Sequence, residues 1–295
     1  MSKKVNKALT TEEVAVKHSQ WGDVWKRFRR NKLAVFGMII AIALVLIAIF
    51  ANVIAPYDPT QISTSRFEFP SLAHLMGTDD FGRDLLSRVI YGARVSLLIS
   101  LLSLIISLVL GVALGATAGY FGGWYENLVM RICDIFMCIP GMLLAVCISS
   151  LLGIGILNTA IAIAVSGVAP CIRQIRACVL QVRSQEYVEA ARATGESTLK
   201  IIFHEILPNI LSPLIVDSTM RVGGNILQIS GLSFIGLGVQ PPTSEWGSIM
   251  SAGQKYITTF WPMITFPGIA ILLTVFAFNV MGDGLRDALD PKLKQ

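Results

Sequence analysis

Long apolar runs dominate the pattern of hydrophobic and polar positions along this chain. A hydrocarbon core of about 30 Å needs roughly 20 apolar residues in helical form, and six runs reach that length. They cover residues 33–55, 95–120, 128–151, 156–179, 210–231 and 261–281. The pattern predicts an all-α polytopic membrane protein with six transmembrane helices.

Composition supports this fold class. Apolar residues make up 54% of the 295 residues and charged residues only 15%, whereas an ordinary soluble domain carries about 25% charge. The first run, 33–55, follows a polar segment of 32 residues, which is unlike the arrangement of a cleaved signal peptide. We therefore expect 33–55 to remain in the protein as a membrane anchor.

Basic residues are distributed unequally between the polar segments. Six spans put both termini on one side, where Lys and Arg total 17 in segments 1–32, 121–127, 173–209 and 282–295. The opposite segments, 56–94, 152–155 and 232–260, hold 5. Because basic residues collect in cytoplasmic loops, we predict that both termini are cytoplasmic. The predicted organisation is a cytoplasmic tail (1–32), a first span (33–55), an extracytoplasmic segment (56–94), a membrane core of five spans (95–281) and a cytoplasmic tail (282–295).

The N-terminal tail is strongly basic. Nine Lys and Arg residues lie in the first 32 positions, and such a segment can bind nucleic acid or anionic lipid. Its place directly before an apolar run favours lipid and argues against nucleic acid. Trp21, Trp25 and Phe28 recur at spacings of four and three among the basic residues. We predict an amphipathic helix on the inner membrane surface, with a basic disordered tail as the alternative.

Several ionisable residues lie inside predicted spans, where a charge is costly and is therefore a candidate for function. Asp217 and Arg221 are four residues apart, so we expect them to pair on one helix face, either at a subunit interface or along a substrate path. Arg131 and Asp134 are three apart and nearer the cytoplasmic side, where pairing or snorkelling is expected.

The external segment 56–94 carries a charged cluster. Its members are Asp79, Asp80, Arg83, Asp84 and Arg88. Thr78 is predicted to cap a helix that begins near Asp79, and Asp84 and Arg88 are predicted to form an i,i+4 pair. Three carboxylates in six residues also suggest calcium, but their spacing is not that of an EF-hand loop. Further along, Trp246, Tyr256 and Trp261 suit an outer aromatic belt.

The sequence contains no evident catalytic or metal-binding motif. Its five cysteines lie in or beside apolar runs without CxxC spacing, and its three histidines are scattered, so a metal or redox role is not favoured. No GxxxxGK[ST] phosphate-binding loop is present. We expect a chain that is not an enzyme and that has no cofactor of its own.

The longest polar stretch on the predicted cytoplasmic side is residues 181–209. Its pattern predicts two short helices separated at Gly195, with Ser197 capping the second. Pro208 then lies near the start of the fifth span, where its missing N–H is harmless. Because the loop is built as helix, break and helix rather than as a plain connector, it is predicted to be held by a partner.

Part of this loop resembles the EAA motif of ABC importer permeases, EAA-x3-G-x9-I-x-L-P. The matching residues are Glu189, Ala190, Ala191, Gly195, Leu207 and Pro208. The motif's Ile position is occupied by Glu205, with Ile206 next to it. The resemblance implies that this loop docks a short coupling helix into a cleft of a cytoplasmic ATPase.

Other segments resemble the C-type permease of the dipeptide, oligopeptide and nickel importer family. They include WKRFRRNKLA at 25–34, GTDDFGRDLLSRVIYGARVSL at 77–97, GLSFIGLGVQ at 231–240 and GDGLRDALDP at 282–291. The family implies a type I ABC importer permease in the bacterial cytoplasmic membrane. Its expected partners are a homologous second permease, two ATPase subunits that bind ATP and Mg²⁺, and an extracytoplasmic solute-binding protein. The external segment is expected to contact the binding protein or the second permease.

Other functions remain open at this point. A dipeptide or oligopeptide importer is the leading hypothesis, and import of nickel or a metal–chelator complex is the alternative within the family. Broken helices and intramembrane charges also fit a stand-alone carrier or channel, although that class does not explain the EAA-like loop. A membrane-embedded enzyme would require convergent polar groups at one depth, and no such set is evident.

Overall fold

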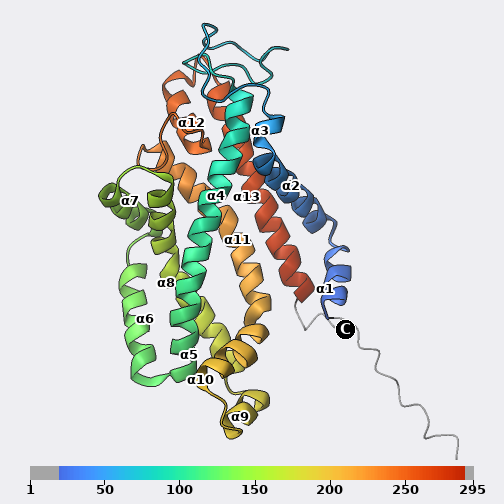
Figure 1. Cartoon of the computed structure of the whole chain (residues 1–295), viewed down its shortest axis with the longest axis vertical. Helices are drawn as coiled ribbons and strands as arrows, with labels where there is room; N and C mark the ends of the chain where they lie inside the picture. Colours follow the sequence, from blue (N-terminus) through green and yellow to red (C-terminus); the bar gives the residue numbers. More distant parts are fainter. Residues whose placement is uncertain (1–19, 290–295) are drawn as a thin grey trace, which may run out of the picture.

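Long helices run side by side along the molecule (Figure 1). The structure is a computed structural model that describes residues 20–289 and is all-helical across them. The predicted tail segments 1–19 and 290–295 lie outside the described residues. The α-helices are α1 (Gln20–Phe28), α2 (Lys32–Ile49), α3 (Ala51–Ile54), α4 (Leu85–Gly111), α5 (Thr117–Phe121), α6 (Gly123–Met137), α7 (Gly141–Leu152), α8 (Ile156–Val182), α9 (Glu186–Ala193), α10 (Thr198–Lys200), α11 (Leu207–Phe234), α12 (Trp246–Gly253) and α13 (Pro262–Leu289). Shorter turns are π-helical at Val112–Ala116 and Ile201–Ile206 and 3₁₀ at Gln254–Tyr256.

Five predicted spans correspond to long apolar helices, and the third does not. The described residues contain 5 helices long and apolar enough to cross a membrane: Lys32–Ile49, Leu85–Phe121, Ile156–Val182, Thr198–Phe234 and Pro262–Leu289. The third predicted span, 128–151, is a bent pair of helices in which α6 and α7 meet at an angle of 86°. Pro140 stands immediately before α7, and its missing N–H and fixed φ interrupt the helix there. The pair forms a sixth span only if the bent unit is counted as one.

The glycines at four-residue spacing bring two helices into close contact. A Cβ on Gly111 would lie 2.5 Å from Cys171 Sγ, and one on Gly115 would lie 2.7 Å from the Ile172 carbonyl oxygen. A Cβ on Gly119 would lie 2.8 Å from Val179 Cβ. Small residues at such a spacing allow neighbouring backbones to approach. This face therefore fixes the long helix 85–121 against α8.

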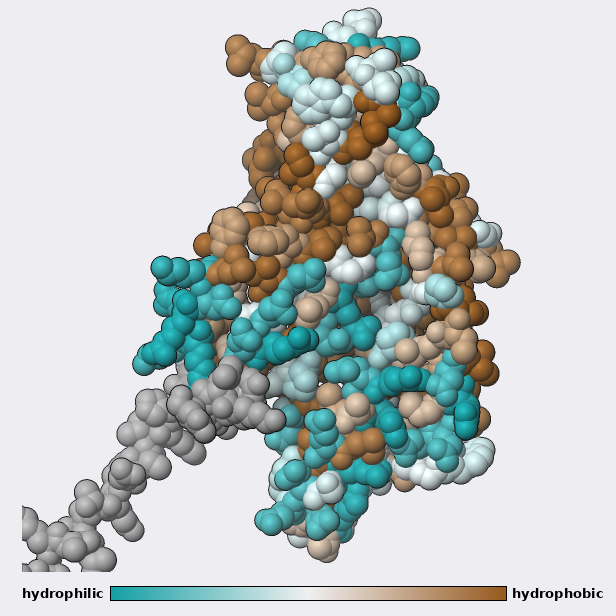
Figure 2. Space-filling model, turned by 180° about the vertical axis from the view of Figure 1, so that it is seen from behind, coloured by the Kyte–Doolittle hydropathy of each residue, from teal (hydrophilic) through white to brown (hydrophobic). Residues whose placement is uncertain are grey.

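The polar segments lie at the two ends of the molecule. Figure 1 shows 55–84 and α12 near its upper end and α9, α10 and the end of α13 in its lower part. Figure 2 shows hydrophobic surface in the upper and middle regions and mainly hydrophilic surface below. This division suits a protein whose middle lies in lipid.

Trp246 does not belong to an outer aromatic belt, contrary to the sequence prediction. Its side chain is 0% exposed, and its Nε1 donates a hydrogen bond to the Val89 carbonyl at 2.9 Å. Gly92 makes room for the indole, since a Cβ there would lie 2.7 Å from Trp246 Cδ1. The short helix α12 therefore packs into the bundle, whereas Trp261 remains 47% exposed.

Candidate functional site

The loop from Glu186 to Pro208 contains the predicted break at Gly195. This glycine has a φ of +78° with open space around its Cβ position. Its N–H donates to the Arg192 carbonyl at 3.0 Å, and the N–H of Glu196 donates to the Ala191 carbonyl at 3.1 Å. These two bonds form a Schellman motif, in which glycine supplies the left-handed residue. Gly195 is therefore required for its backbone conformation and not for space.

The second helix begins at Thr198 and continues without interruption into α11. Ser197 occupies the N-cap position, as predicted, but its side chain makes no capping hydrogen bond. A π-helical turn, Ile201–Ile206, lies directly before Pro208. The wider turn accommodates a proline ring that would otherwise clash with the preceding turn. The Asn209 side chain donates to the Glu205 carbonyl at 2.6 Å.

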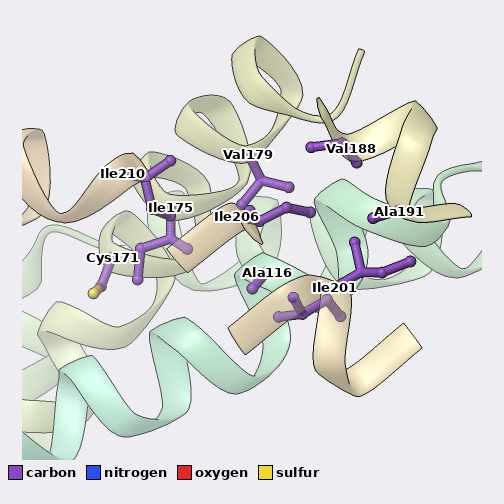
Figure 3. Close-up of a cluster of buried hydrophobic side chains, with 10 residues drawn as sticks. Ala116, Cys171, Ile175, Val179, Val188, Ala191, Ile201, Ile206 and Ile210 are labelled. Carbon is purple, nitrogen blue, oxygen red and sulfur yellow. The ribbon is translucent and has the colours of Figure 1, made fainter. Parts of the chain in front are cut away.

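An apolar cluster holds the loop against the ends of the long helices. The buried residues drawn in Figure 3 come from the loop, from α8, from the start of α11 and from the end of the helix 85–121. They are Ala116, Cys171, Ile175, Val179, Val188, Ala191, Ile201, Ile202, Ile206 and Ile210. Because a packed apolar cluster resists deformation, a force applied to the loop is transmitted to α8 and α11.

Basic side chains add polar tethers on the same side. Arg192 stacks over the Tyr120 ring, with its guanidinium carbon 4.7 Å from the ring centroid. Arg183 donates to the Gly119 carbonyl at 2.8 Å, and Arg176 pairs with Glu126. The loop is thus connected to α5 through Arg192, and α8 is connected to α5 and α6 through Arg183 and Arg176.

The outward face of the loop carries exposed apolar side chains. Leu199 is 66% exposed and Phe203 is 57% exposed, at positions four apart on one side of the helix. Glu189 and Ala190 are also exposed. Burial raises the pKa of Tyr187, and the negative charge of Glu205 raises it further. The loop therefore combines a packed inner face with an apolar and acidic outer face.

The residues of the EAA-like pattern divide between these two faces. Ala191 faces the apolar cluster, whereas Gly195 and Pro208 are exposed. Glu205 and Leu207 are half-buried. Ile206, the neighbour of the motif's Ile position, is 0% exposed. The π-helical turn brings this isoleucine inward, and Glu205 is left at the edge of the cluster.

Of the two intramembrane pairs that the spacing suggested, the Asp217–Arg221 pair is confirmed, whereas Arg131 and Asp134 do not pair with each other. Asp217 accepts a hydrogen bond from Arg221 Nε on α11. Asp134 pairs with Arg173 of α8 instead of with Arg131. The three-residue spacing allows a local pair, but α6 packs against α8 and presents Asp134 to Arg173. Arg131 is exposed.

The external cluster is also arranged differently from the prediction. The helix begins at Leu85, and Asp84 caps it by accepting from the Ser87 N–H at 2.7 Å. Arg88 pairs with Asp79 and not with Asp84. Asp79 also accepts from Arg83 Nε at 2.7 Å, and this arrangement closes residues 79–83 into a buried turn. The predicted cap at Thr78 and the Asp84–Arg88 pair are therefore wrong.

The carboxylates of this cluster are used in hydrogen bonds and ion pairs. His74 Nδ1 lies 2.9 Å from Asp84 Oδ1. Burial raises the pKa of Asp80, and the adjacent Asp79 carboxylate adds to this rise. Among residues 20–289, no group of three or more His, Cys, Asp or Glu side chains could hold a metal ion.

Sequence reasoning missed a polar connection between α4 and α12. Glu245 is 0% exposed and caps α12 by accepting from the Ser248 N–H at 2.9 Å. Ser96 on α4 donates to its other oxygen at 3.1 Å. Burial raises the pKa of this carboxyl. Glutamate is not among the preferred N-cap residues, so no capping signal in the sequence pointed to Glu245.

Buried serines on α4 were a second missed feature. Ser96, Ser100, Ser103 and Ser107 follow one helix face and are all buried. Ser100 donates to the Val222 carbonyl and Ser107 to the Ala164 carbonyl, both at 3.0 Å. Hydroxyl groups of this kind join helices inside a membrane. Their spacing of four, three and four in the sequence could have indicated the shared face.

Comparisons with known proteins agree with this arrangement. A family model described as "Binding-protein-dependent transport system inner membrane component" matches residues 111–295. A second, the "N-terminal TM domain of oligopeptide transport permease C", matches residues 19–71. A chain of the MetNI methionine ABC transporter in an inward-facing conformation has a TM-score of 0.58 at 18% identity, covering 70% of this chain and 98% of that one.

Curated relatives match nearly the full length. The dipeptide transport system permease protein DppC of Escherichia coli K12 is 48% identical over 280 residues, covering 92% of this chain and 93% of the relative. The glutathione transport system permease protein GsiD of Shigella flexneri is 44% identical over 280 residues, covering 93% and 91%. The fold and these matches define a multi-pass inner-membrane permease of an ABC importer. The chain belongs to the binding-protein-dependent transport system inner membrane component family.

Proposed function

We propose that this chain is one of two permeases in an importer of short peptides and that residues 186–208 couple it to an ATPase. The paired permease, two ATPase subunits and an extracytoplasmic solute-binding protein complete the proposed assembly. In this assembly ATP and Mg²⁺ bind to the ATPase subunits, and this chain carries no catalytic site. ATPase closure moves the loop, and the loop moves α8 and α11 between two arrangements.

The observation that carries this proposal is the two-sided construction of the loop. Its inner face is packed against α8 and the end of the helix 85–121, which supports transmission of movement. Its outer face exposes Leu199 and Phe203, which supports docking in an apolar cleft. A loop that only joined two spans would gain nothing from exposed apolar side chains next to a fixed backbone.

Short peptides are the substrate class that the relatives favour. The relative that is 48% identical is named for dipeptide transport, and the one that is 44% identical is named for transport of glutathione, which is itself a tripeptide. Nickel or a metal–chelator complex is the alternative substrate within this type of importer. The relatives whose names give a substrate here transport peptides, and this supports the first choice.

Cytoplasmic termini follow from the charge distribution. The segments on the side of the termini hold 17 basic residues, and those on the opposite side hold 5. This difference supports cytoplasmic termini through the positive-inside rule. It also puts the loop on the side where ATP is available. A protease added outside sealed right-side-out vesicles should leave a tag on either terminus intact, and cleavage of the tag would contradict the orientation.

Uptake by the reconstituted complex tests the substrate class. Proteoliposomes containing this permease, its partner permease, the ATPases and the binding protein should accumulate a labelled dipeptide when ATP is present on the side of the ATPases. Nickel ions added in place of the dipeptide should not accumulate. Nickel uptake without dipeptide uptake would overturn the peptide assignment while leaving the permease assignment intact.

A further inference from the structure

A polar cavity lies where α1 meets α2 and α13, far along the chain from the loop 186–208. Its volume is about 380 Å³. It is lined by Arg27, Arg30, Asn31, Gly284, Asp287 and Ala288. Because α2 begins and α13 ends here, the cavity is at the boundary between the apolar spans and the polar end of the molecule.

The walls of this cavity are fixed by close packing. Phe28 is 2% exposed and packs with Ala34 and Ala288, so its ring contacts protein and not headgroups, contrary to the sequence prediction for this side chain. A Cβ on Gly284 would lie 2.1 Å from Ala34 Cβ, which shows how closely α13 approaches α2. The cavity is therefore a formed site and not a gap between loosely placed helices.

The charge of the cavity favours an anion. Two arginines face one carboxylate, Asp287, among the lining residues. Asn31 Oδ1 accepts from the Ala34 N–H at 3.1 Å, which leaves the amide nitrogen of Asn31 as a donor. Lys26 and Arg29 are exposed and are not among the lining residues. Guanidinium groups bind phosphate oxygens well because their donors match the geometry of the anion.

The surface next to the cavity is apolar. Leu33 is 56% exposed, Phe36 52% and Ile39 56% along α2, and Trp25 on α1 is 48% exposed. Figure 2 shows hydrophobic surface giving way to hydrophilic surface towards the lower part of the molecule. A ligand that fills the cavity can therefore have an anionic head and a hydrocarbon tail.

We propose that this cavity binds the headgroup of an anionic phospholipid. Arg27 and Arg30 hold the phosphate, the Asn31 amide donates to it, and Asp287 accepts a hydrogen bond from a headgroup hydroxyl. The acyl chains lie along the exposed apolar side chains of α2. The site differs from general attraction between a basic segment and a membrane, because two particular arginines bind the lipid while their neighbours do not.

Native mass spectrometry of the purified full-length permease complex tests this assignment. Phosphatidylglycerol and phosphatidylcholine with identical acyl chains are titrated in turn, and bound lipid is counted. The test variant is Arg27→Gln/Arg30→Gln. The matched control, Lys26→Gln/Arg29→Gln, removes the same charge from the same segment but leaves the lining residues intact. Elution profile and melting temperature establish that both variants fold.

We expect wild type and the control pair to retain phosphatidylglycerol in preference to phosphatidylcholine. The Arg27/Arg30 pair should bind phosphatidylglycerol roughly 30-fold more weakly, as expected for the loss of two basic contacts at a membrane surface. Equal losses in the two variants, or no loss in either, would overturn the site. Equal retention of the two lipids would also overturn it. Displacement of the lipid by millimolar inorganic phosphate would overturn the lipid assignment by showing that the cavity binds phosphate alone.

Discussion

At the scale of single residues, conformation and burial decide which positions matter. Gly195 has a φ of +78° in open space, so its role is separable from packing. Glu245 is the opposite case, because it is fully buried and its pKa is raised by that burial. Neither property follows from residue type alone. Each gives a substitution whose effect can be distinguished from general damage.

Replacing Gly195 with alanine should reduce coupling without preventing membrane insertion. The left-handed conformation costs a non-glycine residue about 1 kcal/mol, and asparagine tolerates it better than alanine. Substrate-stimulated ATP hydrolysis by the reconstituted complex should therefore decrease in the order wild type, Gly195→Asn, Gly195→Ala. Gly224→Ala adds the same methyl group in open space without a positive φ and is the matched control. An equal loss in both alanine variants would contradict the conformational role of Gly195.

The substitution Glu245→Gln should destabilise the protein less than Glu245→Ala does. Alanine leaves the Ser248 N–H and the Ser96 hydroxyl without an acceptor, at a cost of about 1–3 kcal/mol. Because the pKa of Glu245 is raised, its stabilising contribution is present at low pH and is lost as the pH rises through the folded-state pKa. Melting temperatures should be measured in detergent across a range of pH. The melting temperature of Glu245→Gln should increase relative to that of wild type as the pH rises. A constant difference at every pH would contradict this assignment.

At the scale of helices and loops, sequence periodicity predicts which elements form but not all of their contacts. The apolar runs located five long helices, and the EAA-like pattern located the break at Gly195. Broken helices were expected, but the size of the bend at Pro140 was not predicted. The run 128–151 is apolar on both sides of the proline, and the length of an apolar run does not fix the direction of the second helix. The partners of Asp134 and Arg88 come from packing between elements, which local spacing does not encode.

Gly115→Ala should destabilise the contact between the helix 85–121 and α8. A Cβ there would lie 2.7 Å from a backbone oxygen of α8, and backbone cannot move aside as a flexible side chain can. Overpacking of this kind costs about 1–3 kcal/mol. Gly268→Ala, whose nearest neighbour is 3.9 Å away, is the control. Thermal unfolding in detergent should show a lower melting temperature for the first variant only.

A double-mutant cycle should distinguish the observed partner of Arg88 from the one expected from spacing. Asp79→Asn and Arg88→Met should be strongly coupled, by about 1 kcal/mol or more, because the two side chains form a buried pair. Asp84→Asn and Arg88→Met should be nearly additive. Unfolding free energies of the four variants in each cycle provide the test. Strong coupling between Asp84 and Arg88 would instead support the i,i+4 pair expected from the spacing.

At the scale of the whole molecule, the packing suits a membrane subunit that is driven from one end. The sequence was sufficient for the fold class and for the position of the loop, because apolar length and a spaced motif are local signals. It was not sufficient for the inner face of the loop, where Ala116 and Cys171 from distant helices meet Val188 and Ile206. The loop packs directly against the ends of these helices, and this packing supports the proposed coupling.

The most direct test is whether the loop holds the ATPase. A tagged, full-length chain expressed with its partner subunits should recover the ATPase on affinity purification. Leu199→Asp/Phe203→Asp should abolish that recovery while the partner permease is retained. Leu72→Asp, at a 99% exposed position in the external segment, should leave it unchanged. Full ATPase recovery with the charged loop variant would contradict the central claim.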